Sequence, residues 1–162
     1  MQTFSYLQRD SSHNRAVVKV ATAIGLVCYE ALTSVYTFLP PFFGLFFSYL
    51  LFFANSKLRF YEVIYIFLYI TVYEIDKGFH LFSFIIFFTI YYNFLANEIK
   101  KYLYCKWCLA SFYVVGGYLG YYLINCIFSF ILNESMPPLG YNYIIYILID
   151  TILVGNVFKK RL

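Results

Sequence analysis

Two apolar runs joined by a charged corner constrain this sequence more than any other feature. The first run covers residues 60–75, the corner is Asp76-Lys77-Gly78, and the second run covers residues 79–96. Each run approaches the ~20 apolar residues that a helix needs to cross the roughly 30 Å hydrocarbon core of a bilayer. Because the corner is so short, the two helices are expected to be antiparallel neighbours. The sequence therefore predicts a membrane-spanning hairpin around which the other apolar segments pack.

The composition of the chain favours a bilayer as its solvent. Hydrophobic residues make up 62% of the 162 residues and charged residues only 12%, whereas soluble domains usually carry about 25% charged residues. A chain with so few charged side chains cannot cover an apolar core with a polar surface. The first fifteen residues are polar, and no small-residue cleavage site follows the next apolar run, so we expect no cleavable signal peptide.

Six apolar segments are long enough to suggest six membrane crossings. We predict an all-α integral membrane fold, a compact bundle of six transmembrane helices in a single domain at residues 16–158. A tail at residues 1–15 precedes it, and a basic tail at residues 159–162 follows it. The second span is expected to begin at Leu39-Pro40-Pro41, since proline is tolerated in the first turn of a helix. The predicted spans cover residues 16–36, 39–53, 60–75, 79–96, 108–132 and 141–158.

Basic residues predict the orientation of this bundle. With six spans, eleven of the twelve Lys and Arg residues lie on one side of the membrane, and only Lys77 lies on the other. Because cytoplasmic loops are enriched in Lys and Arg, both termini are expected in the cytoplasm. The outer loops are too short to hold a catalytic domain. Topology alone explains the basic clusters, so we expect no nucleic-acid partner.

Three polar residues inside the predicted spans are the first candidates for a functional site. Glu30, Asn125 and Asp150 all fall in the outward half of the bundle and could share one layer. Ionisable groups are costly inside a membrane, so such residues either stabilise packing or bind a small ligand or a proton. No basic residue lies within a turn of Asp150. We therefore expect Asp150 to be protonated or hydrogen-bonded to a neighbour such as Asn125.

Small residues with a spacing of four occur in two of the predicted spans. Gly116 and Gly120 form one pair, and Ala21 and Gly25 form the other. Such pairs allow helix backbones to approach closely. Packing inside the bundle is the expected use of both pairs.

Cys105 and Cys108 form a C-x-x-C motif, which is typical of redox pairs and of half a zinc site. No second motif of this kind and no nearby histidine completes a metal site. The motif is expected at the cytoplasmic interface, where thiols stay reduced. We therefore expect structural thiols, no metal and no cofactor. His80, at the start of the fourth span, is expected to be an isolated interfacial residue.

Several layout features occur together along the chain. The second span opens at Leu39-Pro40-Pro41, and a basic tail, Lys159-Lys160-Arg161, closes the last span. The outer corner of the third span contains Glu74, then Asp76, then Gly78. This layout resembles the MreD family of rod-shape-determining inner-membrane proteins, in which an acid followed by glycine, more usually Asp, ends the third span.

The resemblance implies a non-enzymatic, multi-pass scaffold in a bacterial inner (cytoplasmic) membrane. Such a protein works with an MreC-like partner and with cell-wall synthesis enzymes to control cell shape. Two alternatives remain open. A substrate-binding subunit of an energy-coupling-factor-type vitamin transporter is also a six-span bundle, and Glu30, Asn125 and Asp150 would then line an outward pocket. A membrane thiol oxidoreductase would use Cys105 and Cys108.

Overall fold

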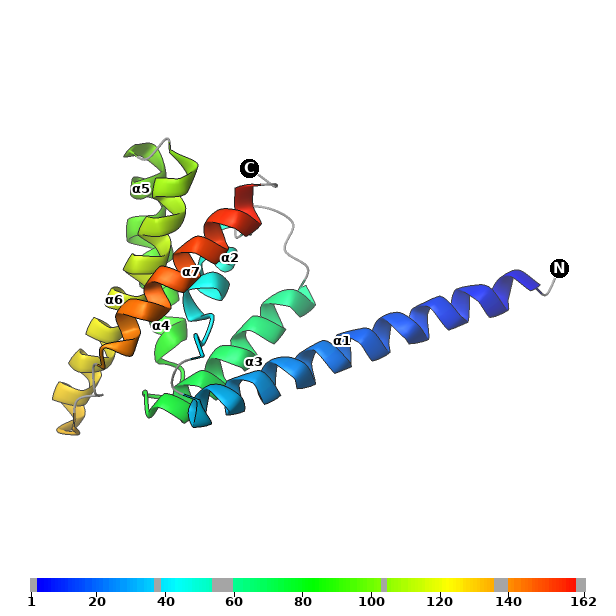
Figure 1. Cartoon of the computed structure of the whole chain (residues 1–162), viewed down its shortest axis with the longest axis horizontal. Helices are drawn as coiled ribbons and strands as arrows, with labels where there is room; N and C mark the ends of the chain where they lie inside the picture. The colour runs from blue at the N-terminus through cyan, green and yellow to red at the C-terminus, as the bar shows by residue number, and fades with distance from the viewer. Residues whose placement is uncertain (1–2, 37–38, 54–59, 103–104, 136–139, 160–162) are drawn as a thin grey trace.

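The computed structural model describes residues 3–36, 39–53, 60–102, 105–135 and 140–159, and the regular elements in these ranges are all helical (Figure 1). They are α1 (Thr3–Val35), α2 (Phe43–Phe53), α3 (Phe60–Lys77), α4 (Ser83–Ile90), the π-helical segment η1 (Tyr91–Ala96), α5 (Asn97–Tyr102), α6 (Lys106–Leu132) and α7 (Asn142–Lys159). Because α4, η1 and α5 follow one another without interruption, they form one continuous segment. The described chain therefore forms six helical segments, so the all-helical prediction is confirmed.

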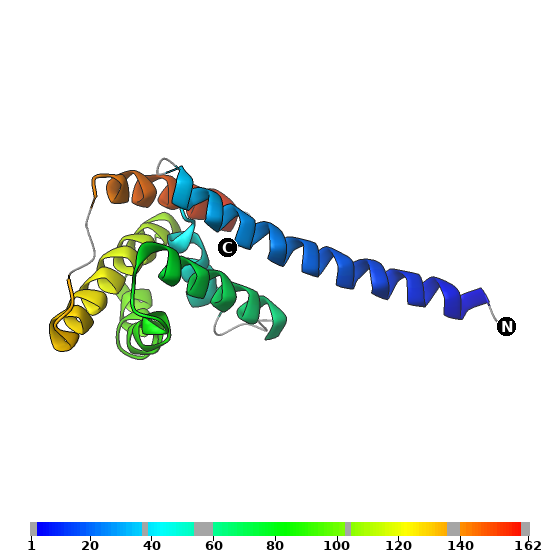
Figure 2. The same ribbon diagram turned by 90° about the horizontal axis from the view of Figure 1, so that it is seen from below.

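The first helix is much longer than the predicted first span. α1 contains 33 residues, about 50 Å at 1.5 Å per residue, whereas a bilayer core is about 30 Å thick. It extends without a break from Thr3, and no Gly or Pro occurs in residues 3–24 to interrupt it. Most of the segment predicted as a tail is thus helical. Figures 1 and 2 show the N-terminal half of α1 as an arm extending away from the other helices.

The second helix begins later than predicted. α2 starts at Phe43, not at Leu39, and contains only 11 residues, about 16 Å of helix. Pro41 disfavours a helical conformation of Pro40, and Phe42 has a left-handed backbone with φ of 49°. The predicted span at residues 39–53 is therefore corrected to a non-helical start followed by a half-length helix.

The connection between α3 and α4 is longer than the predicted three-residue corner. Gly78 has φ of 69°, the left-handed conformation that glycine adopts after the end of a helix. The Phe79 N–H donates to Glu74 O at 2.9 Å, and the Gly78 N–H donates to Ile75 O at 3.4 Å. Phe82 is also left-handed, with φ of 64°. α4 consequently begins at Ser83 and not at Phe79.

The centre of packing is the pair α2 and α6, and not the hairpin that the sequence indicates. α2 packs against α6, α7 and α3, whereas α3 packs mainly on α1 and α4 packs mainly on α6. Contact between α3 and α4 includes the Phe67 ring, whose centroid lies 5.7 Å from that of Phe84 and 6.5 Å from that of Phe88. The predicted central hairpin is therefore corrected, because α3 and α4 touch through these rings but each packs mainly on another helix.

Aromatic rings fill the space around α2. Phe43 and Phe47 are fully buried, and the Phe43 ring centroid lies 4.9 Å from that of Tyr121. α6 comes close to these rings through Gly117, where an added Cβ would lie 2.6 Å from Phe47 Cδ1. We call the following set the aromatic core: Phe43, Phe47, Tyr73, Phe84, Phe87, Tyr118 and Tyr121.

The two small-residue pairs have different surroundings. A Cβ on Gly116 would lie 2.5 Å from the Tyr91 hydroxyl, and one on Gly120 would lie 2.7 Å from Phe87 Cε2. This pair therefore packs against α4 and η1 inside the bundle, as expected. A Cβ added to Gly25 would meet no atom within 4 Å, and Ala21 is exposed. Internal packing of the second pair is thus a wrong prediction, because that face of α1 meets no other described helix.

One described helix, Trp107–Leu132 in α6, is long and apolar enough to cross a membrane by length and composition. Shorter apolar helices cover Val20–Val35, Phe43–Phe52, Ser83–Ala96 and Asn142–Val157. Only 33% of the apolar window in α6 is buried within the structure. Its apolar side chains therefore face outward more than they face the core.

Candidate functional site

Residues 39–42 form a partly buried, non-helical stretch between α1 and α2, here called the helix break. Proline has no backbone N–H, so Pro40 and Pro41 bring carbonyl acceptors to the break but no donors. The Tyr29 hydroxyl donates to Pro40 O at 2.7 Å. The Tyr69 hydroxyl is hydrogen-bonded to Pro41 O. Side chains of α1 and α3 therefore satisfy the carbonyl groups of Pro40 and Pro41.

Glu30 of α1 lies on one side of the helix break and is fully buried. Its Oε2 is hydrogen-bonded to the same Tyr69 hydroxyl that reaches Pro41 O. The Thr33 hydroxyl lies 3.1 Å from Glu30 Oε1 and 2.9 Å from the Glu30 carbonyl oxygen. Glu30 therefore connects α1 to α3 and, through Tyr69, to the break.

Asp150 of α7 lies at the start of α2 and is also fully buried. Its Oδ2 accepts hydrogen bonds from the Gly44 N–H at 2.8 Å and from the Tyr118 hydroxyl at 2.9 Å. The residue before α2 is Phe42, which has no side-chain acceptor for the first amides of the helix. Asp150 supplies that acceptor from another helix. Its second oxygen, Oδ1, is buried and has no hydrogen-bond partner among the described residues.

Glu74 caps α4 in the same way that Asp150 caps α2. Its carboxylate accepts from the Phe82 N–H and the Phe84 N–H, both at 2.8 Å, and from the Ser83 and Tyr121 hydroxyls, both at 3.0 Å. In both cases a left-handed phenylalanine precedes the helix, and a tyrosine of α6 binds the acid. Glu74, predicted at the outer corner, is therefore buried. Its predicted neighbour Asp76 instead pairs with Lys77, at 2.7 Å.

Asn125 belongs to a different group of residues. Its Oδ1 accepts from the His80 N–H at 3.2 Å, and its Nδ2 donates to the Tyr121 carbonyl oxygen at 3.0 Å. The prediction that Asn125 binds Asp150 is therefore wrong, because Asn125 faces the connection between α3 and α4. His80 is not isolated, since its Nε2 lies 3.2 Å from Ser129 Oγ.

The structure thus brings two of the three predicted polar residues to the helix break. Tyr69 interacts electrostatically with both Glu30 and Asp150, whereas Asn125 lies elsewhere. Sequence reasoning missed the hydroxyl partners Tyr69 and Tyr118, because 19 tyrosines make each one inconspicuous. For Tyr118, the sequence does hold a signal. Tyr118 and Tyr121 are spaced so that two hydroxyls lie on one face of an apolar helix.

The C-x-x-C motif lies at the start of α6, far along the chain from the helix break. Cys105 precedes the helix, Cys108 lies in its first turn, and both are exposed and free. A hydrogen bond from the Cys108 thiol lowers the pKa of Cys105. Among the described residues, no three His, Cys, Asp or Glu side chains come together as a metal site.

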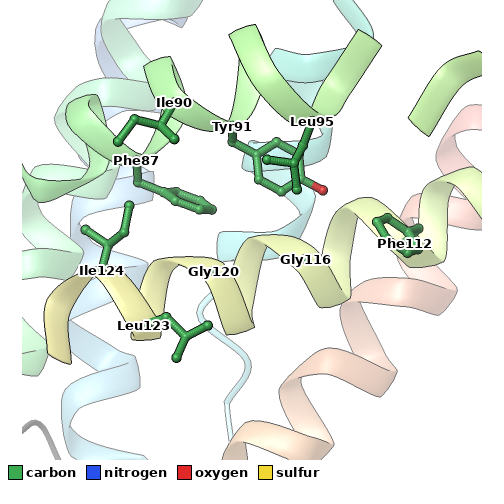
Figure 3. Close-up of a pocket in the computed structure, with 9 residues that line it drawn as sticks. All are labelled: Phe87, Ile90, Tyr91, Leu95, Phe112, Gly116, Gly120, Leu123 and Ile124. Carbon is green, nitrogen blue, oxygen red and sulfur yellow. The ribbon is translucent and has the colours of Figure 1, made fainter. Parts of the chain in front are cut away.

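Two hollows on the surface are apolar. One, of about 360 Å³, lies between α4–η1 and α6 and is shown in Figure 3, where Gly116 and Gly120 face Tyr91 and Phe87. The other, of about 560 Å³, lies between α3 and α4, near Phe67. Neither hollow contains the carboxylates of the helix break.

No protein-family model, no curated protein and no solved structure matches this chain. The site must therefore be interpreted from its own geometry. That geometry is a broken helix held between two buried carboxyl groups, Glu30 and Asp150.

Proposed function

We propose that this chain is a non-enzymatic, multi-pass membrane scaffold that acts through helix–helix contacts with partner membrane proteins. The first support is the outer surface of the helices. Large apolar side chains are exposed on every long helix, which in water would be costly but in lipid is favourable. They include Val20 and Ile24 of α1, Ile64 and Leu68 of α3, Ile85 and Ile90 of α4, Leu123 and Ile127 of α6, and Ile144 and Leu148 of α7.

The arrangement of the helix ends supports the six-span orientation. Figure 1 places α5 and the end of α7 at one end of the bundle, and the connection between α3 and α4 at the other end with the end of α6. Such an alternation is what six crossings with both termini in the cytoplasm require. In this arrangement the helix break and α2 together make the second crossing, and side chains satisfy the backbone at the break, as a bilayer demands.

The observation that carries the scaffold proposal is the aromatic core. A vitamin-binding subunit needs a cavity of several hundred Å³ lined by polar anchoring groups. In the described bundle the corresponding central space is occupied by rings such as Phe43 and Phe47, which are fully buried. Interiors packed in this way favour one rigid shape, which suits a protein that presents fixed surfaces to partners.

The proposed partners follow from the resemblance to the MreD family. They are a bitopic, MreC-like protein and the cell-wall synthesis enzymes of a bacterial inner membrane. This role requires no cofactor, and it places the two hollows and the outer faces of α1 in contact with lipid or with partner helices.

The proposal is tested by depleting the protein in the cells that produce it. We expect rod-shaped cells to become round, and we expect a wild-type copy to restore their shape. Uptake of vitamins should be unchanged, as measured with labelled compounds. Depleted cells that keep their shape but lose uptake of one vitamin would replace the scaffold with the transporter alternative.

A further inference from the structure

We propose that Glu30 and Asp150 form a proton-binding site at the helix break, in which each carboxyl group holds a proton and thereby fixes the start of α2. The inference concerns a ligand, the proton, and goes beyond the scaffold role. It depends on hydrogen-bond geometry within the chain and would hold for any function of the bundle.

The proton on Glu30 follows from counting hydrogens at Tyr69. The Tyr69 hydroxyl carries one hydrogen but contacts two oxygens, Glu30 Oε2 and Pro41 O. Pro41 O can only accept, and so can an ionised carboxylate. One of the two contacts would then lack a hydrogen. If Glu30 carries a proton on Oε2, it donates to Tyr69, Tyr69 donates to Pro41 O, and both contacts are satisfied.

The proton on Asp150 follows from its unpartnered oxygen. Two donors, the Gly44 N–H and the Tyr118 hydroxyl, converge on Oδ2, whereas Oδ1 is fully buried without a partner among the described residues. An ionised carboxylate at this position would be a buried negative charge held only by neutral donors, which are the Gly44 and Leu45 amides and the Tyr118 hydroxyl. A neutral carboxyl group avoids that cost, because burying an unpaired charge is far more expensive than burying a neutral polar group.

The basic side chain that acts on Glu30 is Lys77, which an acid of its own helix already holds. The groups that face Glu30 from α1, α3 and α7 are tyrosines, together with Asp76 and Lys77. Lys77 is paired with Asp76 at 2.7 Å. The groups that interact electrostatically with the two carboxyls are Tyr29, Tyr69, Asp76, Lys77, Tyr118 and Tyr146.

Glu74 can be compared with Glu30 and Asp150, because all three carboxyl groups are buried. They differ in the hydrogen-bond donors that surround them. Both of its oxygens accept hydrogen bonds, from two backbone amides and two hydroxyls. Four donors satisfy an ionised carboxylate. Both oxygens of Glu74 are therefore supplied with donors, whereas Asp150 Oδ1 has no hydrogen-bond partner among the described residues.

Loss of the two protons would alter the helix break. When Glu30 gives its proton to water, Pro41 O and Glu30 compete for the single hydrogen of Tyr69. When Asp150 also ionises, two negative charges act on the same tyrosine. Repulsion then favours separation of α1 from α7, and entry of water at the break. Deprotonation should therefore expose the first amides of α2, including that of Gly44.

The test uses infrared spectroscopy on the purified full-length protein in lipid nanodiscs. Protonated carboxyl groups absorb separately from ionised carboxylates and from the backbone. At neutral pH we expect two protonated-carboxyl bands, one shifted by ¹³C-labelled Asp and the other by ¹³C-labelled Glu. Glu30→Gln should remove the Glu band and Asp150→Asn should remove the Asp band. Glu74→Gln is the matched control and should keep both.

The labelling assigns the bands in the wild-type protein, so the result does not depend on the folding of any variant. Raising the pH should remove both bands and lower the protection factor of the Gly44 amide, which is the exchange rate corrected for the intrinsic rate at the same pH, by tenfold or more. Glu30→Gln combined with Asp150→Asn should make that protection factor independent of pH. A wild-type protein with no protonated-carboxyl band at neutral pH would overturn the proposal. So would a Glu band that persists in Glu30→Gln and disappears in Glu74→Gln.

Discussion

Gly44 shows how a single residue allows two helices to meet at the helix break. Its amide donates to Asp150 Oδ2 at 2.8 Å, and a Cβ in its place would lie 2.9 Å from the same oxygen. The same Cβ would lie 2.8 Å from Val114 Cγ1. The absence of a side chain at this position therefore lets α7 cap α2 directly.

Replacing Gly44 by alanine should destabilise the bundle. The added methyl group must displace Asp150 or Val114 in a packed interior, and such overpacking costs about 1–3 kcal/mol. Gly25→Ala is the matched control, because an added Cβ there meets no atom within 4 Å. It should be neutral or slightly stabilising, since alanine favours helices. Denaturant titration in detergent micelles measures both changes, and equal stabilities of the two variants would contradict the prediction.

Substitutions of Asp150 should separate its capping role from its charge. Asp150→Asn keeps an oxygen for the Gly44 N–H and the Tyr118 hydroxyl, so the yield of folded protein should remain close to that of the wild type. Asp150→Leu leaves both donors unpaired and should cost about 1–3 kcal/mol for each buried donor. The yield of monodisperse protein after detergent extraction measures both effects. Folded Asp150→Leu protein at wild-type yield would show that the cap is dispensable.

At the scale of elements, α2 and α4 begin by the same device. Each helix follows a left-handed phenylalanine, and each is capped by an acid from another helix, Asp150 or Glu74. Tyr118 and Tyr121, one turn apart on α6, bind the two acids. One face of α6 therefore positions the starts of two helices, which explains why α6 packs against both of them.

The start of α6 carries a thiol that should be unusually reactive. The hydrogen bond from Cys108 lowers the pKa of Cys105, so more of Cys105 is thiolate at neutral pH than of an ordinary cysteine. We expect Cys105 to react with iodoacetamide faster than Cys28, which is also exposed and free. Cys108→Ser should alter this difference, because it changes the donor to Cys105. Peptide mass spectrometry after timed alkylation measures the rates, and equal rates at Cys105 and Cys28 would contradict the prediction.

At the scale of the whole molecule, apolar periodicity predicts where the helical segments lie, but it does not predict their partners. Apolar run length places five of the segments within a few residues, and burial of Glu30, Asn125 and Asp150 agrees with their expected positions inside the bundle. The hydrogen-bond partner of Asp150, in contrast, could not be predicted from the sequence. It is the backbone amide of Gly44, which carries no side-chain signal, and its accessibility depends on two prolines and a left-handed Phe42.

The last prediction concerns the orientation of the six helical segments in the membrane. Figure 1 brings α5 and the end of α7 to one end, opposite the connection between α3 and α4. Lys101 of α5, Lys106 at the start of α6 and Lys159 at the end of α7 lie at the first end, so it should be cytoplasmic. Reporter fusions after Phe53, Ala96 and Leu162 should therefore read as cytoplasmic, and fusions at Gly78 and Ser135 as external. An external reading at Leu162 would require an odd number of crossings for a cytoplasmic N-terminus.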